Sequence, residues 1–330
     1  MQTEHELPIW EQTARVILQK NSSAVEVRNK SWIKNNYIPS WVEITNVGLD
    51  QFFTRPEIAD RCWKSFCKFI KDAGEDLTNY KFVEPAAGLG AFYDLLPENR
   101  RVGVDVVNFR REYIQKDFLS WSPKKNGYRY ACIGNPPFGY RAWLALAFVN
   151  HAAEFSDFVG FIVPMAFQSS GKSNVKDRVK GLHLVHSETL PQDSFIGADG
   201  KVLKVNALWQ IWSRNGVSKE VKPATCNQYI DLFTVDMRKE RLCGQRRMHE
   251  ADYFLQRTFY NEPPTLVKSF SEVKYVCGYG IVIKSEKREI IKVLKNTDWR
   301  KYNNLAAHNC KHISMCHIRE ALTDAGFIDV

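Results

Sequence analysis

The chain has 330 residues, of which 44% are hydrophobic and 25% are charged, and its formal net charge is +9 at pH 7. This composition excludes a disordered tail, and the length suits one large domain plus a smaller one, because single cores rarely grow beyond about 250–300 residues. The start of the chain is acidic and lacks an apolar run, and the most apolar stretch, 158–167, is far shorter than the roughly 18–20 residues of a spanning helix. We therefore expect neither a secretory signal nor a membrane segment.

The cysteines and the charges indicate the compartment and the class of partner. Eight cysteines are scattered without a paired spacing, which is typical of reduced thiols and predicts a cytoplasmic protein. From Arg214 to the end, 20 lysines and arginines stand against 14 aspartates and glutamates. Excess positive charge attracts polyanions, so this part of the chain favours a nucleic-acid partner.

Residues 1–49 have no assigned role, and the first clear element follows them. We expect a helix that is capped by Thr54, has Pro56 near its first position and ends at Gly74. Its apolar side chains recur at helical spacing and would share one face: Ile58, Cys62, Phe66, Phe69 and Ile70.

Beyond this helix, short apolar strands alternate with helices. Strands are predicted at 81–83, 101–107, 130–133, 158–163, 182–190 and 202–212, and the clearest helix at 140–153. Such alternation predicts an α/β fold with a mostly parallel, Rossmann-like sheet and helices on both faces. Ligands of these sheets bind beyond the carboxyl ends of the strands, so the chemistry is expected in the loops after Val83, Val104 and Ile133.

A polar segment at 213–223 predicts a linker into a second domain. We expect a catalytic domain over 50–213 and a smaller α+β domain over 214–330. The smaller domain should end in two helices, around 287–294 and 313–324.

The loop at 84–90, after the first strand, reads Glu-Pro-Ala-Ala-Gly-Leu-Gly. Gly88 and Gly90 would let the backbone turn sharply and approach a ligand that a Cβ atom would exclude. Glu84, at the strand end, can hold a ligand's ammonium group. A tight turn into a helix is the alternative interpretation.

Carboxylates also stand near the ends of the next strands. Asp105 is placed to bind two ribose hydroxyls, as acidic residues do in dinucleotide-binding folds, although it follows the glycines by only 15–17 residues. Asp117 and Phe118 combine a carboxylate with a ring and suit an adenine, although Asp117 alone would also fit a turn. Three such positions at successive strand ends favour a ligand site over three separate turns.

The segment 133–139 reads Ile-Gly-Asn-Pro-Pro-Phe-Gly. Pro136 and Pro137 cannot continue a strand, so Asn135 is held rigidly just beyond it. The Asn135 side-chain oxygen and the Pro136 carbonyl would accept both hydrogens of one amino group. They would orient its lone pair and stabilise the positive charge that develops as nitrogen attacks a sulfonium methyl. Phe138 offers a flat ring on which the target base can stack.

Together these motifs resemble the amino-methylating DNA methyltransferases, specifically the gamma-ordered adenine-N6 group with an Asn-Pro-Pro-Phe motif. The resemblance runs from about 50 to 212, and the order of the motifs is that of the group. Phe53 and Thr54 match its leading cofactor-binding motif, and Glu84, Pro85, Ala86, Gly88 and Gly90 match its glycine loop. Asp105 matches the ribose-binding position, Asp117 and Phe118 the adenine-binding pair, and Asn135, Pro136, Pro137 and Phe138 the catalytic motif.

The resemblance implies S-adenosylmethionine as cofactor, double-stranded DNA as substrate and N6 of an extruded adenine as methyl acceptor. Extrusion costs on the order of a few kcal/mol and is needed because the amino group is paired within the stack. In the family an aromatic residue stacks on the other face of the base. Phe195 is the candidate, with packing on the core as the alternative. Residues 214–330 would recognise the target, and a cognate restriction endonuclease or a partner subunit would complete a restriction–modification system.

The second domain has basic residues that are candidate phosphate contacts, although a solvated charged face is the alternative for each. They are Arg246, Arg247, Lys284, Lys287, Arg288, Arg300 and Lys301. His308, Cys310, His312, Cys316 and His317 cluster farther on, but their spacing matches no usual zinc pair, so no metal site is predicted.

Other substrates stay open. Asn-Pro-Pro-Phe also occurs in enzymes that methylate the guanine amino group of ribosomal RNA, and Asn-Pro-Pro-Tyr in enzymes that methylate a glutamine of release factors. The Phe-Phe-Thr-Arg-Pro segment at 52–56 and the basic domain after the catalytic one favour the DNA enzymes. Cytosine N4 is chemically possible with the same acceptors. A non-catalytic nucleic-acid binder is disfavoured by the intact motifs.

Overall fold

The computed structural model describes residues 52–107, 109–124, 127–139, 142–168, 174–197, 201–216, 224–238, 242–259, 262–273, 276–305 and 311–329. The segment 1–49, for which the sequence predicts no role, lies outside them. The chain forms two compact units. The first contains the described residues of 52–167 and 174–216, and the second contains Gln168 and those from 224 onward. No helix in the described ranges is long and apolar enough to span a membrane.

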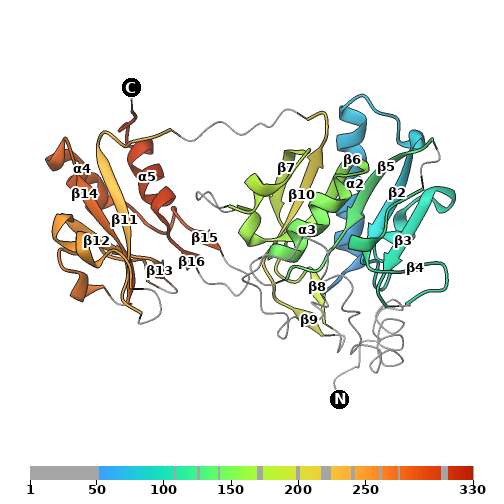
Figure 1. Ribbon diagram of the computed structural model, residues 1–330, viewed down its shortest axis with the longest axis horizontal. Helices are drawn as coiled ribbons and strands as arrows, with labels where there is room; N and C mark the ends of the chain where they lie inside the picture. Colours follow the sequence, from blue (N-terminus) through green and yellow to red (C-terminus); the bar gives the residue numbers. More distant parts are fainter. Residues whose placement is uncertain are drawn as a thin grey trace, which may run out of the picture. The chain divides into compact units, whose positions relative to one another are not determined.

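A seven-stranded sheet forms the centre of the first unit (Figure 1). Its strand order is β4-β3-β2-β5-β6-β10-β7. The strands are β2 (Tyr80–Pro85), β3 (Arg101–Asp105), β4 (Ile114–Gln115), β5 (Arg129–Gly134), β6 (Ser156–Pro164), β7 (His183–Thr189) and β10 (Ala207–Ser213). Neighbours from β4 to β6 are parallel, whereas β10 runs antiparallel to both β6 and β7. The loops after β2, β3 and β5 therefore meet at one edge of the sheet.

Helix α2 (Pro56–Asp72) covers one face of this sheet because its apolar side chains lie on one side. Its buried residues include Cys62 and Phe66, and the Phe66 ring lies 6.4 Å from that of Trp209 in β10. The helix ends just before Gly74, which adopts a left-handed φ of +77°. The predicted apolar face and end of this helix are confirmed.

Helix α3 (Trp143–Ala152) lies on the opposite face. Strand side chains alternate between faces, so Ala131 belongs to the core under α2 whereas Tyr130 points away from it. The Tyr130 ring meets Phe155, just beyond α3, at 6.1 Å. The predicted α/β fold with helices on both faces is therefore confirmed.

The start of α2 differs from the prediction. Thr54 is not the cap but belongs to β1 (Phe53–Thr54), and Arg55 is the N-cap residue, in extended conformation before Pro56. β1 pairs with β8 (Phe195–Ile196), which pairs with β9 (Val202–Leu203). This small sheet fixes the segment before α2.

The single strand predicted at 202–212 is two strands in two sheets. β9 belongs to the small sheet and β10 to the large one, and the chain bends between them. Val205 in this bend donates its N–H to the Gln192 carbonyl at 3.0 Å. The bend lets the chain leave the small sheet and enter the large one.

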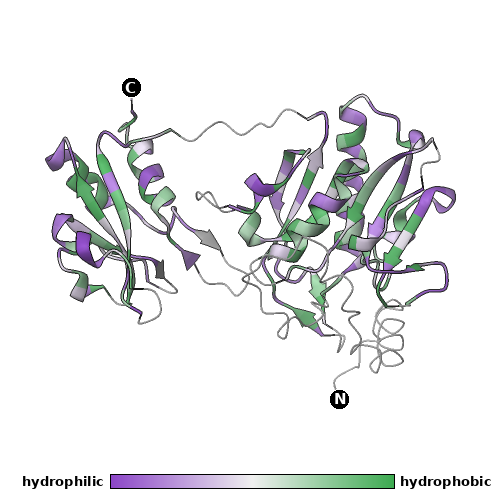
Figure 2. Ribbon diagram, viewed as in Figure 1, coloured by the Kyte–Doolittle hydropathy of each residue, from purple (hydrophilic) through white to green (hydrophobic). Residues whose placement is uncertain are grey.

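The second unit is α+β, as predicted. Its antiparallel sheet has the order β11-β14-β12. The strands are β11 (Ile230–Asp236), β12 (Tyr253–Gln256) and β14 (Cys277–Ile283), and a smaller sheet contains β13 (Thr258–Phe259), β15 (Asn304–Leu305) and β16 (Lys311–His312). Helices α4 (Lys287–Asn296) and α5 (Met315–Asp324) each differ from the predicted helices by two residues at one end. Figure 2 shows largely hydrophobic strands in both units.

Candidate functional site

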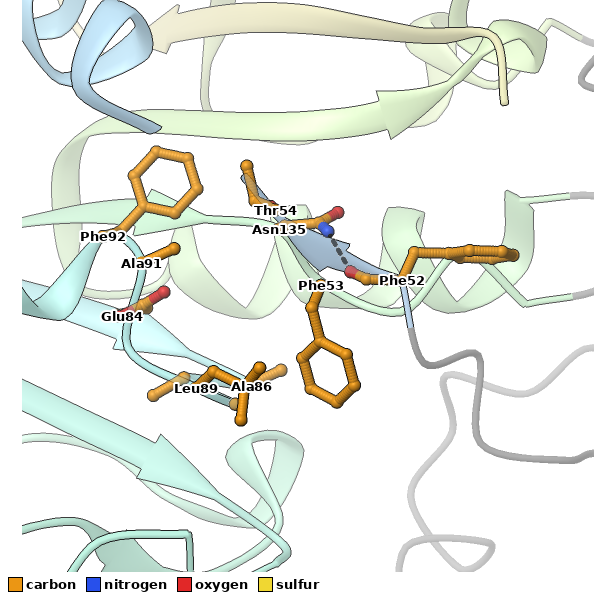
Figure 3. A pocket seen from close by; sticks show the side chains of 11 residues that line it. Phe52, Phe53, Thr54, Glu84, Ala86, Leu89, Ala91, Phe92 and Asn135 are labelled. Carbon is orange, nitrogen blue, oxygen red and sulfur yellow. Dashed lines mark hydrogen bonds between the residues drawn. The ribbon is translucent and has the colours of Figure 1, made fainter. Parts of the chain in front are cut away.

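A pocket lies at the carboxyl-terminal edge of the parallel strands in the first unit (Figure 3). About 280 Å³ of space that protein atoms do not fill lies within it, and part of this space is open to solvent. Its lining comes from the segment before α2, the end of β2 with the loop that follows it, and the residue after β5: Phe52, Phe53, Thr54, Glu84, Ala86, Ala87, Gly88, Leu89, Ala91, Phe92 and Asn135. Three motifs that are far apart in the sequence therefore meet in one place.

The glycine loop is tied to the neighbouring strand by a main-chain hydrogen bond. Ala87 donates its N–H to the Val104 carbonyl at 3.1 Å. Gly88 has a φ of +51°, and a Cβ atom there would lie 3.3 Å from the Phe53 ring. Ala86, which lines the pocket, has a φ of +57°, a conformation that costs a residue with a side chain on the order of 1 kcal/mol. This strained backbone stands at the pocket, where such strain is most often functional.

Two other members of the predicted glycine motif do not line the pocket. Pro85 is the last residue of β2. Gly90 packs against Arg110 and Tyr113, where a Cβ atom would come within 2.7 Å of the Tyr113 hydroxyl. The loop continues into a three-residue 3-10 turn, Tyr93–Leu95, and not into the α-helix that the turn interpretation allowed.

Asp105 uses both carboxylate oxygens to hold the backbone. Oδ2 accepts the N–H of Gly88 at 2.7 Å, and Oδ1 accepts the N–H of Val107 at 2.8 Å. Burial raises the pKa of Asp105 to about 6, although these hydrogen bonds act in the opposite direction. The structure thus shows Asp105 as the link between the glycine loop and β3, and ribose binding stays a prediction.

Glu84 supplies an ionisable carboxyl group to the lining of the pocket. Only 3% of its surface is exposed, and its Oε2 atom has no hydrogen-bond partner. Burial raises the pKa of Glu84 well above its usual range, and the charge of Asp105 acts in the same direction, while the N–H groups of Tyr93 and Phe92 oppose it. A buried acceptor at a pocket fits a ligand that brings N–H donors.

Asn135 is held by the backbone of the segment before α2. Its Nδ2 atom donates to the Phe52 carbonyl at 2.7 Å (Figure 3). A carbonyl only accepts, so this bond determines which end of the amide faces Phe52. The other end, Oδ1, is buried and has no partner, and the Thr54 hydroxyl oxygen in the same lining is also buried and unpartnered. Pro136, the residue after Asn135, is buried, and Pro137 is half-buried.

The aromatic cluster of Phe52, Phe138 and Phe195 corrects the prediction for two residues. Its ring centroids are 5.8 to 6.5 Å apart. Phe138 is 7% exposed and Phe195 is fully buried, so neither ring presents a free face to a base. The reason is tertiary: β8 pairs with β1, which places Phe195 beside Phe52. Core packing, the alternative for Phe195, is what the structure shows.

The predicted adenine-binding pair is also corrected. Phe118 is 2% exposed, and its ring lies 5.1 Å from Phe148 and 5.0 Å from His151, both in α3. The helix therefore covers the ring that was expected to pack on an adenine. Asp117 caps a 3-10 turn by accepting the Leu119 N–H at 3.0 Å, as the turn interpretation holds.

Sequence reasoning did not single out some residues at this edge. The Phe52 carbonyl positions Asn135, a main-chain role that leaves no side-chain signature. Val106, directly after Asp105, is 46% exposed and gives an apolar surface at the end of β3. Val106 could have been found from the sequence because it directly follows Asp105, the candidate ribose ligand.

Arg247 in the second unit is engaged within that unit. Its guanidinium pairs with Asp231 at 2.8 Å and with Glu250 at 2.7 Å, and it lies over the Phe233 ring. These hydrogen bonds hold the pKa of Asp231 and of Glu250 below the usual range. Arg247 is therefore held by ion pairs within its own unit, which favours a structural role over the predicted phosphate contact.

Three more of the predicted contacts have local partners. Lys287 pairs with Asp252 at 2.5 Å, Arg300 pairs with Asp298 at 2.7 Å, and Lys284 donates to the Asn227 carbonyl at 2.8 Å. The remaining three, Arg246, Arg288 and Lys301, are exposed. These three stay as predicted phosphate contacts.

The histidines and cysteines near the C-terminus have structural contacts where they are described. His308 and Cys310 lie outside the described residues. His317 is buried and closes the cap of α5, where its Nδ1 accepts the Ser314 N–H at 3.1 Å, and burial lowers its pKa to about 4. Within the described ranges, no group of three or more His, Cys, Asp or Glu residues is arranged to hold a metal ion.

Comparison with known proteins gives structural matches alone. No protein-family model matches the chain, and no curated protein is significantly similar to it. The solved structures include the type IIG restriction endonuclease BpuSI, at 13% identity over 69% of this chain and 29% of that chain, with a TM-score of 0.40. They also include the 23S rRNA methyltransferase ErmE, at 15% identity over 51% of this chain and 72% of that chain, with a TM-score of 0.35. A third is the N-methyltransferase NodS from Bradyrhizobium japonicum in complex with S-adenosylhomocysteine, at 11% identity over 63% and 100%, with a TM-score of 0.35.

Proposed function

We propose that the chain is an S-adenosylmethionine-dependent methyltransferase that methylates N6 of an adenine in DNA. The observation that carries the proposal is the state of Asn135. Its amide nitrogen is fixed on the Phe52 carbonyl at 2.7 Å, which leaves Oδ1 as a buried, unpartnered acceptor in the lining of the pocket. An acceptor held in this way suits an amino group whose nitrogen must become positively charged as it is methylated.

The pocket fits the cofactor in its polar atoms. Glu84 Oε2 and the Thr54 hydroxyl are buried without partners, as expected of groups that bind the two ends of a ligand's amino-acid portion. No lysine or arginine is among the described residues that line the pocket. The loop also ends in a three-residue 3-10 turn, which offers little of the helix dipole that favours phosphates. These features favour a cofactor with an ammonium group and no phosphate.

In the proposed mechanism the protein positions and stabilises the reacting nitrogen. Bound S-adenosylmethionine supplies a methyl group on a positively charged sulfur. Asn135 Oδ1 and the Pro136 carbonyl accept the two hydrogens of the target amino group, so that the lone pair is free to attack. The buried surroundings strengthen these hydrogen bonds, because water competes less for them.

The target base is proposed from the chemistry of the acceptors and the charge of the chain. Adenine N6, cytosine N4 and guanine N2 all carry two hydrogens that such acceptors can bind. The excess of basic residues after Arg214, including the exposed Arg246, Arg288 and Lys301, supports a polyanionic substrate. Among polyanionic substrates, adenine in DNA is favoured because the Asn-Pro-Pro-Phe motif follows the glycine loop, which is the motif order of the gamma-ordered adenine-N6 group.

Methyl transfer tests the proposal directly. The full-length protein is incubated with methyl-labelled S-adenosylmethionine and, separately, with duplex DNA, duplex RNA and a ribosomal fraction, and the labelled nucleosides are identified. We expect N6-methyladenine in DNA. Label in N4-methylcytosine or in N2-methylguanine of ribosomal RNA would replace the proposed substrate. An absence of transfer to all three, with a folded protein, would refute the methyltransferase activity on nucleic acids.

A further inference from the structure

Within the described part of the chain, Glu84 has acidic neighbours, and no hydrogen bond or ion pair joins its carboxyl group to a cation. The residue is 3% exposed, and its Oε2 atom has no hydrogen-bond partner. Each element around it contributes either an acidic or an uncharged group. β3 contributes Asp105, which is 7% exposed, and the 3-10 turn after the glycine loop contributes Asp94.

The guanidinium of Arg110, which lies against the glycine loop at Gly90, is already engaged. Arg110 binds both carboxylate oxygens of Asp94, at 2.5 and 2.8 Å, and donates to the Leu89 carbonyl at 2.6 Å. Tyr113, from the same segment as Arg110, is buried and contributes a neutral hydroxyl. The segment before α2 contributes Phe53 and Thr54, which carry no charge.

An ionised carboxylate in such a place is unfavourable. Burial of an unpaired charge costs far more than protonation of the group, so a buried carboxyl without a cation takes up a proton. The raised pKa of Glu84 expresses the same balance, because loss of solvation outweighs the two N–H groups that face the carboxyl. A ligand that brings a cation reverses this balance.

We propose that Glu84 carries a proton in the free protein and releases it to solvent when the cofactor's ammonium group binds. This inference rests on the proposed function, because it takes the cofactor to be S-adenosylmethionine. The ammonium keeps its three hydrogens, the Glu84 O–H bond breaks, and the resulting carboxylate accepts N–H bonds from the ammonium. Glu84 is thus a specificity-determining residue: it binds a cation with N–H donors and disfavours a ligand that presents an anion to the same place.

Calorimetry tests the proton release. S-adenosylhomocysteine, which keeps the ammonium group, is titrated into the full-length protein at about pH 7 in buffers with different ionisation enthalpies, and the slope of the observed enthalpy gives the protons exchanged. We expect release of about one proton per bound ligand, and an affinity that falls by up to about tenfold for each pH unit below neutrality. Methylthioadenosine, which lacks the amino-acid portion, should bind without proton release.

The matched variant is Glu84→Gln, which keeps the shape and removes the titrating group. It should bind S-adenosylhomocysteine more weakly and without proton release. Binding to the wild-type protein without any proton exchange would overturn the inference and leave the proposed function intact. Release that persists in Glu84→Gln would assign the proton to another group and overturn the inference. A folded protein that binds neither S-adenosylmethionine nor S-adenosylhomocysteine would refute the proposed function, and the inference with it. If the variant does not fold, the comparison of the two ligands on the wild-type protein decides.

Discussion

Replacement of Asn135 by alanine separates catalysis from folding and cofactor binding. The change removes the buried Oδ1 acceptor and the amide nitrogen that donates to the Phe52 carbonyl at 2.7 Å. Loss of one preorganised polar contact to a transition state lowers kcat by about 10²–10³-fold, or roughly 2.7–4 kcal/mol. The unpaired Phe52 carbonyl should lower the free energy of unfolding by about 1–3 kcal/mol. Cofactor affinity should change by less than about tenfold, because one neutral hydrogen bond contributes about 0.5–1.5 kcal/mol.

The assay is single-turnover transfer of labelled methyl to DNA at saturating S-adenosylmethionine, with ligand affinity measured separately. Asn174→Ala is the matched control. Asn174 is 7% exposed, and its Oδ1 accepts the Asp177 N–H at 2.7 Å. The neighbouring Arg178 and Lys180 bond to Asn150, near the end of α3 that is remote from the pocket. This variant should lose stability but keep its rate.

Asn135→Asp distinguishes the acceptor from its positioning. The aspartate keeps an acceptor but places a carboxylate oxygen against the Phe52 carbonyl, where no donor remains. Its rate should fall between those of the wild-type protein and Asn135→Ala. A folded Asn135→Ala protein with a near-normal rate, or an equal loss of rate in Asn174→Ala, would refute the role given to Asn135.

Three further predictions follow from the same geometry. Gly88→Val should abolish S-adenosylhomocysteine binding in calorimetry, because the φ of Gly88 is +51° and a Cβ atom there would lie 3.3 Å from the Phe53 ring. Gly74→Val is the control that should still bind, because Gly74 is also left-handed but has open space around it. Arg246→Ala should flatten the log–log dependence of DNA affinity on salt by about 1 unit. Arg247→Ala should leave that slope unchanged and lower the melting temperature, because Arg247 pairs with Asp231 and Glu250. Equal slopes for the wild-type protein and Arg246→Ala would exclude Arg246 from the DNA surface. The pKa of Asp105 is about 6 in the folded protein, against a usual value of 3.8, so the folded state binds this proton more tightly than the unfolded state does. The contribution of Asp105 to the free energy of unfolding therefore falls as the pH rises from about 4 to about 6, by on the order of 3 kcal/mol. Urea unfolding of wild type and Asp105→Asn across this range should show that difference, and parallel pH profiles would contradict it.

Features that depend on neighbouring residues were predictable from the sequence. The spacing of apolar side chains along α2 determined which face is buried, and Ile58, Cys62, Phe66 and Ile70 are all buried there. The alternation of strands and helices predicted the sheet, and the order of the polar strand ends predicted that Glu84 and Asn135 lie at one edge. Such patterns are local because a helix or a strand repeats every few residues.

The tertiary structure decided which of these side chains remain available to a ligand. Phe195 and Phe118 look alike in the sequence as rings beside polar residues, yet one is buried by the pairing of β1 with β8 and the other by α3. Arg246 and Arg247 are adjacent in a 3-10 turn, yet only Arg247 pairs with Asp231 of β11. Asn135 has a free oxygen because its nitrogen is bound by Phe52, 83 residues earlier. Burial and hydrogen-bond pairing are set by residues that are distant in the chain, and no local periodicity encodes them.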